Sequence, residues 1–173
     1  MKTRFFIIAL GIFLIYGCAD VCKLTGDDKD WLLEKHKSLK YRENGTNTLK
    51  VSVKTHFSTS YSSDDWSPFS EGQEWGESTL YLRDSLYMLS IISSACDNSG
   101  SILLYKKKHS LHVVRFPYYK NSLTNHTVTV LGKEYENCFV YKDSTYIKNL
   151  TFVKKHGIVN IEFRDGYKLE LIP

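Results

Sequence analysis

The strongest constraint on the fold is a two-residue period of apolar side chains that recurs along most of the chain. In residues 48–58, apolar or threonine side chains alternate with polar ones, which gives an extended strand one apolar face and one wet face. Shorter segments of this kind, bounded by turn residues, follow at 79–82, 86–92, 102–105, 111–116, 128–131, 135–141, 146–153, 158–163 and 167–171. Because no helical segment separates them, helical crossovers are excluded and an antiparallel meander is predicted.

The expected fold class is therefore mainly β, with about nine or ten strands in the meander. A flat sheet would expose two edges, so we expect a strongly curved sheet, a half-open barrel or a small sandwich, and the sequence leaves these three open. One short N-terminal helix is predicted where Asp27, Asp28 and Asp30 precede the apolar residues 31–33 and the basic residues 35–37. Acidic side chains favour the start of a helix and basic ones its end.

The N-terminus has the pattern of an export signal. Lys2 and Arg4 precede an unbroken apolar run over residues 5–16, and Gly17 and Cys18 follow. A basic region followed by such an apolar run is typical of a signal peptide. At about 1.5 Å per residue the run would reach only about 18 Å as a helix, less than the ~30 Å hydrocarbon core of a bilayer, so no permanent membrane span is expected.

Residues 15–18 fit a relaxed bacterial lipobox, in which cleavage before Cys18 leaves this cysteine N-terminal and acylated. Two or more acyl chains make a stable anchor, because each buried methylene contributes about 0.8 kcal/mol. Ordinary cleavage after Ala19 is the alternative. The predicted organisation is a lipoprotein signal peptide at 1–17, a lipid anchor and polar tether at 18–30, and a single β domain at 31–173.

Acylation of Cys18 predicts attachment to a membrane of the bacterial cell envelope. Ala19 differs from the aspartate that favours inner-membrane retention, so the outer membrane is expected, with its periplasmic or outer face left open. The formal net charge of +4 falls to about +2 once Lys2 and Arg4 leave with the signal, and the remaining charges are well mixed. No nucleic-acid partner is therefore expected.

The cysteines allow one intramolecular disulfide at most. If Cys18 is acylated, Cys22, Cys96 and Cys138 remain, which is an odd set in an oxidising compartment. We predict a bond between Cys96 and Cys138, with buried free thiols as the alternative. The absence of a CxxC pair disfavours a zinc ribbon or a dithiol redox centre.

The best candidate for a functional site is the long segment 58–77, which has no sustained period and is expected to be a loop. It mixes carboxylates with large aromatic rings, and the residues predicted to contact a ligand are Asp64, Asp65, Trp66, Glu74 and Trp75. Such side chains could stack on a sugar ring, coordinate Ca²⁺ or supply the carboxylate pair of a glycoside hydrolase. The competing interpretation is a solvated acidic loop whose aromatic rings pack on the sheet.

Motifs for other chemistry are absent from the sequence. The acidic residues match no EF-hand loop, and no GxSxG, HExxH, P-loop or GxGxxG motif occurs. His109 and His112, three positions apart on a predicted strand, would point to opposite faces. We predict no metal site, no cofactor and no catalytic residue. The basic turn at 106–108 is expected to protect a hairpin end, with contact to anionic lipid as the alternative.

Three segments resemble small lipoproteins of the Bacteroidota. After Cys18, residues 24–32 are similar to an LT-x-x-x-K-x-W-L opening, residues 132–138 resemble a G-x-x-Y-x-N-V hairpin, and residues 155–171 resemble a C-terminal YGI-x-x-x-E-F-x-DG-x-x-W-x-L hairpin. Tyr167 departs from that last pattern, in which the aromatic residue commonly lies further along. The resemblance implies a membrane-anchored, mostly β lipoprotein and supplies no catalytic residue.

The leading hypothesis is a lipid-anchored, non-enzymatic binding or structural module that contacts the membrane through Cys18 and takes a protein or glycan partner. A glycan-acting enzyme that uses acids of segment 58–77 is the first alternative. The second alternative is a carrier whose half-barrel holds a lipid or a lipoprotein acyl chain.

Overall fold

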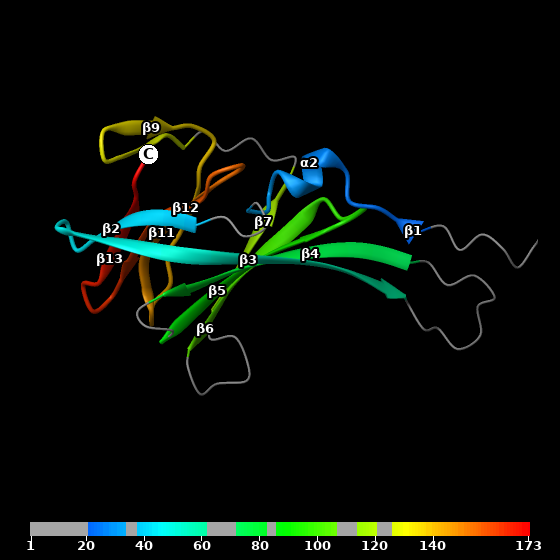
Figure 1. Cartoon of the computed structure of the whole chain (residues 1–173), viewed down its shortest axis with the longest axis horizontal. Coiled ribbons are helices and arrows are strands. Elements are labelled where there is room, and N and C mark those ends of the chain that lie inside the picture. Colours follow the sequence, from blue (N-terminus) through cyan, green and yellow to red (C-terminus); the bar gives the residue numbers. More distant parts are fainter. Residues whose placement is uncertain (1–20, 34–37, 62–71, 83–85, 107–113, 121–125) are drawn as a thin grey trace, which may run out of the picture.

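The computed structural model describes residues 21–33, 38–61, 72–82, 86–106, 114–120 and 126–173. Its elements are β1 (Val21–Cys22), α2 (Gly26–Lys29), β2 (Ser38–Glu43), β3 (Asn47–Tyr61), β4 (Gly72–Leu82), β5 (Tyr87–Ser94), β6 (Ser99–Lys106), β7 (Val114–Tyr119), β8 (Val128–Val130), β9 (Lys133–Tyr135), β10 (Phe139–Tyr141), β11 (Ile147–Val153), β12 (Gly157–Phe163) and β13 (Lys168–Leu171). The predicted mainly β fold is confirmed. Ten strands form a nearly closed, barrel-like antiparallel sheet in the order β10-β11-β12-β13-β2-β3-β4-β5-β6-β7 (Figure 1).

Strand β3 is the longest strand and pairs with a different neighbour along each part of its length. Its first residues pair with β2 as far as Ser52, and from Val53 to Tyr61 it pairs with β4. At about 3.3 Å per residue, a strand of this length spans roughly 50 Å, and Figure 1 shows it crossing the whole molecule. The alternation at 48–58 correctly predicted this strand, which extends further at both ends.

The two groups of strands form one sheet because β13, the last strand of the chain, pairs with β2. In the antiparallel pair between β13 and β2, Leu169 lies opposite Glu43 and Leu171 lies opposite Tyr41. This contact joins a C-terminal group of strands, β10 to β13, to an N-terminal group, β2 to β7. The fold is therefore two meanders joined edge to edge, and each one covers an edge that the other would expose.

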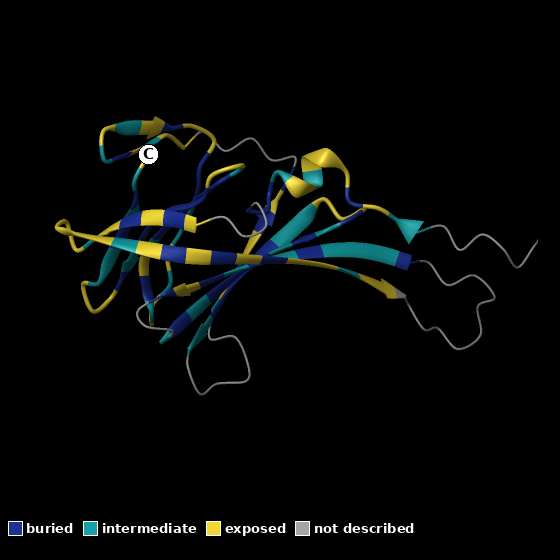
Figure 2. Cartoon of the chain, in the orientation of Figure 1, coloured by how far each residue is buried: buried dark blue, intermediate teal, exposed yellow. Residues whose placement is uncertain are grey.

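Strand β2 was not predicted from the sequence, in which the first expected strand is the segment 48–58. Leu39 and Tyr41 are buried and alternate with exposed neighbours, so the period of two is present over a short segment. Figure 2 shows the resulting alternation of buried and exposed residues along β2 and β3. The helix itself is a single turn, Gly26–Lys29, because the apolar residues 31–33 that follow enter the core.

An aromatic cluster centred on Trp31 fills one part of the core. The ring centroid of Trp31 lies 5.0 Å from that of Tyr118, 5.7 Å from Phe139 and 6.0 Å from Phe152. The backbone beside it is also held, because Leu33 N donates to Ser78 Oγ at 2.9 Å and Thr55 Oγ1 donates to Leu33 O at 2.7 Å. The segment after α2 is thus fixed against strands β3, β4 and β7.

The predicted strand at 135–141 is broken in the structure. Residues Lys133–Tyr135 form β9, which pairs only with β8, and Phe139–Tyr141 form β10, which pairs with β11 in the large sheet. Between them Asn137 adopts a left-handed conformation with φ of 54°, which turns the chain from one sheet to the other. The β8–β9 ribbon therefore stands apart from the barrel, as Figure 1 shows.

Gly100 on β6 is the glycine whose replacement should disturb the barrel most. A methyl group added there would meet the ring and hydroxyl of Tyr118 and the backbone carbonyl of Ile92, to which Tyr118 Oη donates at 2.8 Å. We expect Gly100→Ala to lower the free energy of unfolding by about 1–3 kcal/mol, because a packed core gives way only at the cost of off-rotamer side chains and backbone shifts. Urea denaturation measures this loss. Gly26→Ala is the control, because a methyl group there meets no atom within 4 Å, and an equal effect of the two variants would contradict the prediction.

Candidate functional site

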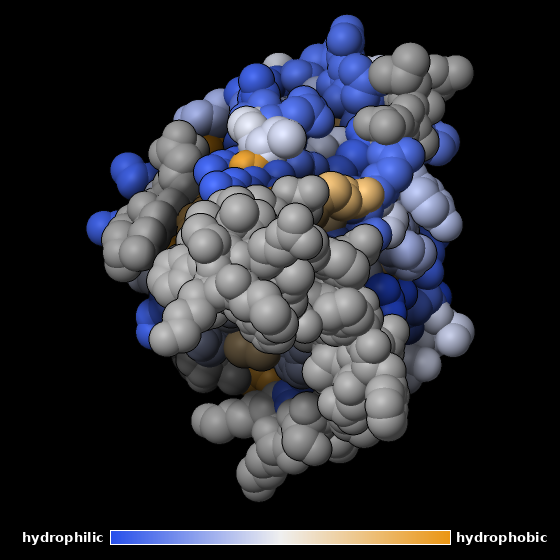
Figure 3. Space-filling view, turned by 90° about the vertical axis from the view of Figure 1, so that its right-hand side faces the viewer, coloured by the Kyte–Doolittle hydropathy of each residue, from blue (hydrophilic) through white to orange (hydrophobic). Residues whose placement is uncertain are grey.

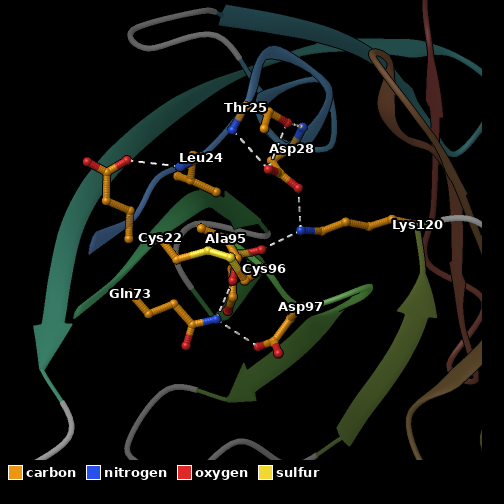
Figure 4. The surroundings of a disulfide bond; sticks show 11 residues. Cys22, Leu24, Thr25, Asp28, Gln73, Ala95, Cys96, Asp97 and Lys120 are labelled. Carbon is orange, nitrogen blue, oxygen red and sulfur yellow. Dashed lines mark hydrogen bonds and ion pairs between the residues drawn. A yellow bond between two sulfur atoms is a disulfide. The ribbon is translucent and has the colours of Figure 1, made fainter. Parts of the chain in front are cut away.

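The structure forms a disulfide between Cys22 and Cys96, whose Cα atoms lie 6.1 Å apart (Figure 4). The predicted bond between Cys96 and Cys138 is therefore wrong. Cys138 is a buried free thiol that lies 3.0 Å from the carbonyl oxygen of Tyr135, and burial raises its pKa. The polar residues 19–30 around Cys22 are typical of a tether, so the sequence pattern did not indicate Cys22 as the partner of Cys96.

The residues around Cys22 are part of the folded body. Strand β1 pairs in parallel with β4, with Val21 opposite Gly72 and Cys22 opposite Gln73. Leu24 is buried, and its backbone N–H donates to Glu74 Oε2 at 3.0 Å. The predicted tether at 18–30 is thus corrected: from Val21 onward these residues belong to the β domain, which the sequence analysis began at residue 31.

Helix α2 is fixed to the barrel through Asp28. Thr25 and Asp28 form a capping box, in which Thr25 N donates to Asp28 Oδ2 at 2.9 Å and Asp28 N donates to Thr25 Oγ1 at 3.2 Å. The other carboxylate oxygen, Asp28 Oδ1, lies 2.7 Å from Lys120 Nζ, which also donates to the carbonyl of Ser94 (Figure 4). The Lys120 side chain is only 3% exposed, so this ion pair is largely shielded from water.

The pKa of Asp28 reflects opposing influences. Burial is the largest single one and would raise it, but the hydrogen bond from Lys120, the two hydrogen bonds with Thr25 and the charge of Lys120 together outweigh burial. The pKa of the Asp28 carboxyl therefore lies below its ordinary value, and the group is ionised at neutral pH.

A pocket of about 540 Å³, which we call the aromatic pocket, lies beside Lys120 and the residue Trp31 that follows helix α2. Its walls come from β9 and the residues after it, from the turn between β11 and β12, and from Trp31. The lining residues are Trp31, Lys120, Lys133, Glu134, Tyr135, Glu136, Asn137, Phe139, Val153, Lys154 and His156. Its volume falls in the range of about 300–1,000 Å³ that is usual for small-molecule sites.

Two polar atoms of the aromatic pocket's residues have no hydrogen-bond partner in the part of the chain that the structure describes. They are the indole Nε1 of Trp31, a residue 4% exposed, and the hydroxyl of Tyr135, a residue 3% exposed. Burial raises the pKa of Tyr135, and the nearby Cys138 raises it further by a smaller amount. The hydroxyl therefore keeps its proton and acts as a donor at neutral pH. Buried donors without an acceptor are uncommon in folded proteins and ask for an explanation.

Cationic side chains lie over both rings. Lys154 Nζ is 5.3 Å from the centre of the Trp31 ring, and Lys133 Nζ is 4.9 Å from that of Tyr135. The imidazole of His156 meets the Tyr135 ring edge-on at 5.2 Å. Lys154 also pairs with Asp27, which is well exposed. The pocket thus combines aromatic walls and buried donors with both lysines and the carboxylates of Glu134 and Glu136.

Of the five predicted ligand-contact residues, the structure describes Glu74 and Trp75, and it does not bring these two together. Glu74 and Trp75 lie in β4, where adjacent side chains point to opposite faces: Glu74 accepts from Leu24, whereas Trp75 lies 6.3 Å from the ring of His56. Glu74 also lines a second hollow of about 430 Å³ with Lys29 and Phe57. Asp64, Asp65 and Trp66 lie outside the described residues.

The sequence analysis missed the aromatic pocket. Its residues come from segments more than 100 positions apart, and none forms a local motif. The only available signal was the aromatic and lysine content near 133–135 and 153–156, which strand pairing alone explains equally well. The described residues contain no group of three or more His, Cys, Asp or Glu side chains that could hold a metal ion.

Comparison with known proteins identified no relative: no family model, no curated protein and no solved structure matches the chain. Within the described residues, no helix has the length and apolar character needed to cross a membrane.

Proposed function

We propose that the protein is a lipid-anchored, non-enzymatic binding module of the bacterial cell envelope, attached through acyl chains on Cys18. The basic and apolar N-terminal pattern followed by Gly17 and Cys18 supports an exported, acylated chain. Ala19 in the next position favours the outer membrane. A disulfide between Cys22 and Cys96 is consistent with export, because such bonds persist in oxidising compartments.

The observation that carries the proposal is that the folded body begins directly after the proposed anchor. Val21 is already paired with β4, and Cys22 is covalently joined to Cys96. Three chain steps separate Cys18 from Val21, so their Cα atoms lie at most about 11 Å apart. An acylated Cys18 would therefore hold the β1 end of the body at the headgroups. In Figure 3 the described surface of this end is mainly hydrophilic, which suits contact with headgroups rather than insertion.

A binding role accounts for the site better than the alternatives do. Among the described residues of segment 58–77, the acids Glu74 and Glu77 are three positions apart on one strand and so point to opposite faces, which does not suit a pair of catalytic carboxylates. Inside the barrel, fully buried side chains such as Leu89, Ile102 and Phe152 occupy the space that an acyl chain would need. The aromatic pocket, in contrast, is open and has unsatisfied donors.

Replacing Cys18 by serine tests the anchor. We expect the parent to partition with membranes and to carry the mass of its acyl chains, whereas Cys18→Ser is released or stays unprocessed, because the hydroxyl cannot form the thioether. Intact-mass spectrometry and membrane fractionation measure both properties. Cys138→Ser is the matched control, because Cys138 is buried inside the fold. A parent protein that begins at Asp20 without lipid would establish cleavage after Ala19 and overturn the proposal.

A further inference from the structure

We infer that the aromatic pocket binds a small organic carboxylate, whose oxygens accept hydrogen bonds from Trp31 Nε1 and Tyr135 Oη while Lys133 and Lys154 balance its charge. This inference rests on the proposed role as a binding module and is independent of the lipid on Cys18.

The two unpartnered donors point to an acceptor. Trp31 and Tyr135 come from distant parts of the chain, yet both line one cavity, and both present a buried N–H or O–H that no described residue satisfies. An indole N–H can only donate, and a tyrosine hydroxyl donates readily. A carboxylate has two oxygens with about four acceptor positions, so a single group can satisfy both donors.

Glu134 and Glu136 line the pocket together with the lysines, but the lysines lie next to the two unpartnered donors, and their charge favours an anion at that point. Side chains alternate along β9, so Lys133 and Tyr135 project from the same side of the strand. The contact between Lys133 Nζ and the Tyr135 ring confirms that these two share a side. Lys154 reaches the pocket from the turn, and its partner Asp27 is 64% exposed and therefore easily replaced as a counter-ion.

Each ammonium group lies over the ring whose donor is buried, Lys154 over Trp31 and Lys133 over Tyr135. Lysine has a flexible four-carbon stem, so its charged end can turn toward a bound anion and uncover the ring beneath. Phe139 and Val153 add apolar wall for the carbon skeleton of the ligand.

Calorimetric titration of the full-length protein, purified in detergent, tests the inference with matched pairs of probes. Benzoate is compared with benzyl alcohol, and glucuronate with glucose, so that each pair differs in the carboxylate; inorganic phosphate is the third anion. We expect at least one carboxylate to bind with 1:1 stoichiometry and about tenfold or more tightly than its neutral partner, in line with hydrogen bonds to a charged group. Preference for benzoate or for glucuronate distinguishes an aromatic acid from a sugar acid.

Tyr135→Phe is the decisive variant, because it removes only the unpartnered hydroxyl. It should weaken carboxylate binding about tenfold while leaving the melting temperature equal to or above that of the parent, since no described residue hydrogen-bonds to this hydroxyl in the free protein. Lys133→Met should also weaken binding about tenfold. Lys155→Met is the control, because Lys155 is exposed, pairs with Asp30 and does not line the pocket.

Three results would overturn the inference: neutral probes that bind as tightly as carboxylates, parental affinity in Tyr135→Phe, or binding of phosphate alone. A protein without lipid that still binds a carboxylate would refute the anchor and leave the pocket assignment intact. An acylated protein that binds none of the probes would refute the pocket assignment and leave the anchor intact.

Discussion

Replacing Asp28 by asparagine should lower the free energy of unfolding by about 3–5 kcal/mol, because it leaves the ammonium group of Lys120 buried without its counter-charge. Lys120 is 3% exposed and Asp28 14% exposed, so water cannot readily replace the lost partner. The substitution also removes a carboxylate from the capping box with Thr25. Urea denaturation at neutral pH measures the loss.

Asp27→Asn is the matched control, because Asp27 is the adjacent residue and pairs with Lys154 at the surface. An exposed pair of this kind contributes about 1 kcal/mol or less. The double variant Asp28→Asn with Lys120→Met should regain much of the lost stability, because replacing both members of a buried pair leaves no unpaired charge. Equal losses in Asp27→Asn and Asp28→Asn would contradict the assigned role.

The stability contribution of Asp28 should also depend on pH with a defined sign. Its pKa is lowered in the folded protein from the ordinary 3.8, so the unfolded state takes up the proton first as the pH falls. The contribution of Asp28 is fully present above its pKa in the unfolded state and is lost as the pH falls through its pKa in the folded state. The difference between parent and Asp28→Asn should therefore be constant above about pH 5 and shrink below pH 4.

Loss of the disulfide should be the other large effect. Cys22 and Cys96 are separated by 74 positions, and opening a loop of this length is expected to cost about 4 kcal/mol through the entropy of the unfolded chain. For a protein of this size the melting temperature should fall by roughly 8–16 °C. Differential scanning calorimetry of the Cys22→Ala, Cys96→Ala double variant measures this change.

Cys138→Ala separates the observed disulfide from the one predicted by the sequence. It should keep a transition that moves to lower temperature when a reductant is added, because the bond between Cys22 and Cys96 remains. The double variant should not respond to the reductant, because Cys138 is a buried free thiol. Loss of the response in Cys138→Ala would show that Cys138 takes part in the bond.

The sequence predicted the strands because their signal is local. In β3 the buried residues Val51 and Val53 lie two positions apart, and the hairpin of β12 and β13 is joined by a turn at Asp165 and Gly166. A strand with one face in the core must alternate, and that alternation can be seen in adjacent letters. Where alternation weakens, the prediction failed: the ends of segment 58–77 are strand in the structure, although serine, threonine, glycine and charged residues there interrupt the apolar period.

The sequence by itself thus determined the mainly β class, most strands and an N-terminus typical of an exported chain. The tertiary structure alone decided three further features. These are the pairing of β13 with β2, the partner of Cys22, and the meeting of Trp31, Tyr135 and Lys154 around one pocket. Each joins segments that are far apart in the sequence, and their proximity follows from how the strands pair and pack in the curved sheet. No periodicity between neighbouring residues records which distant edges meet, so this information is physically present only in the packed fold.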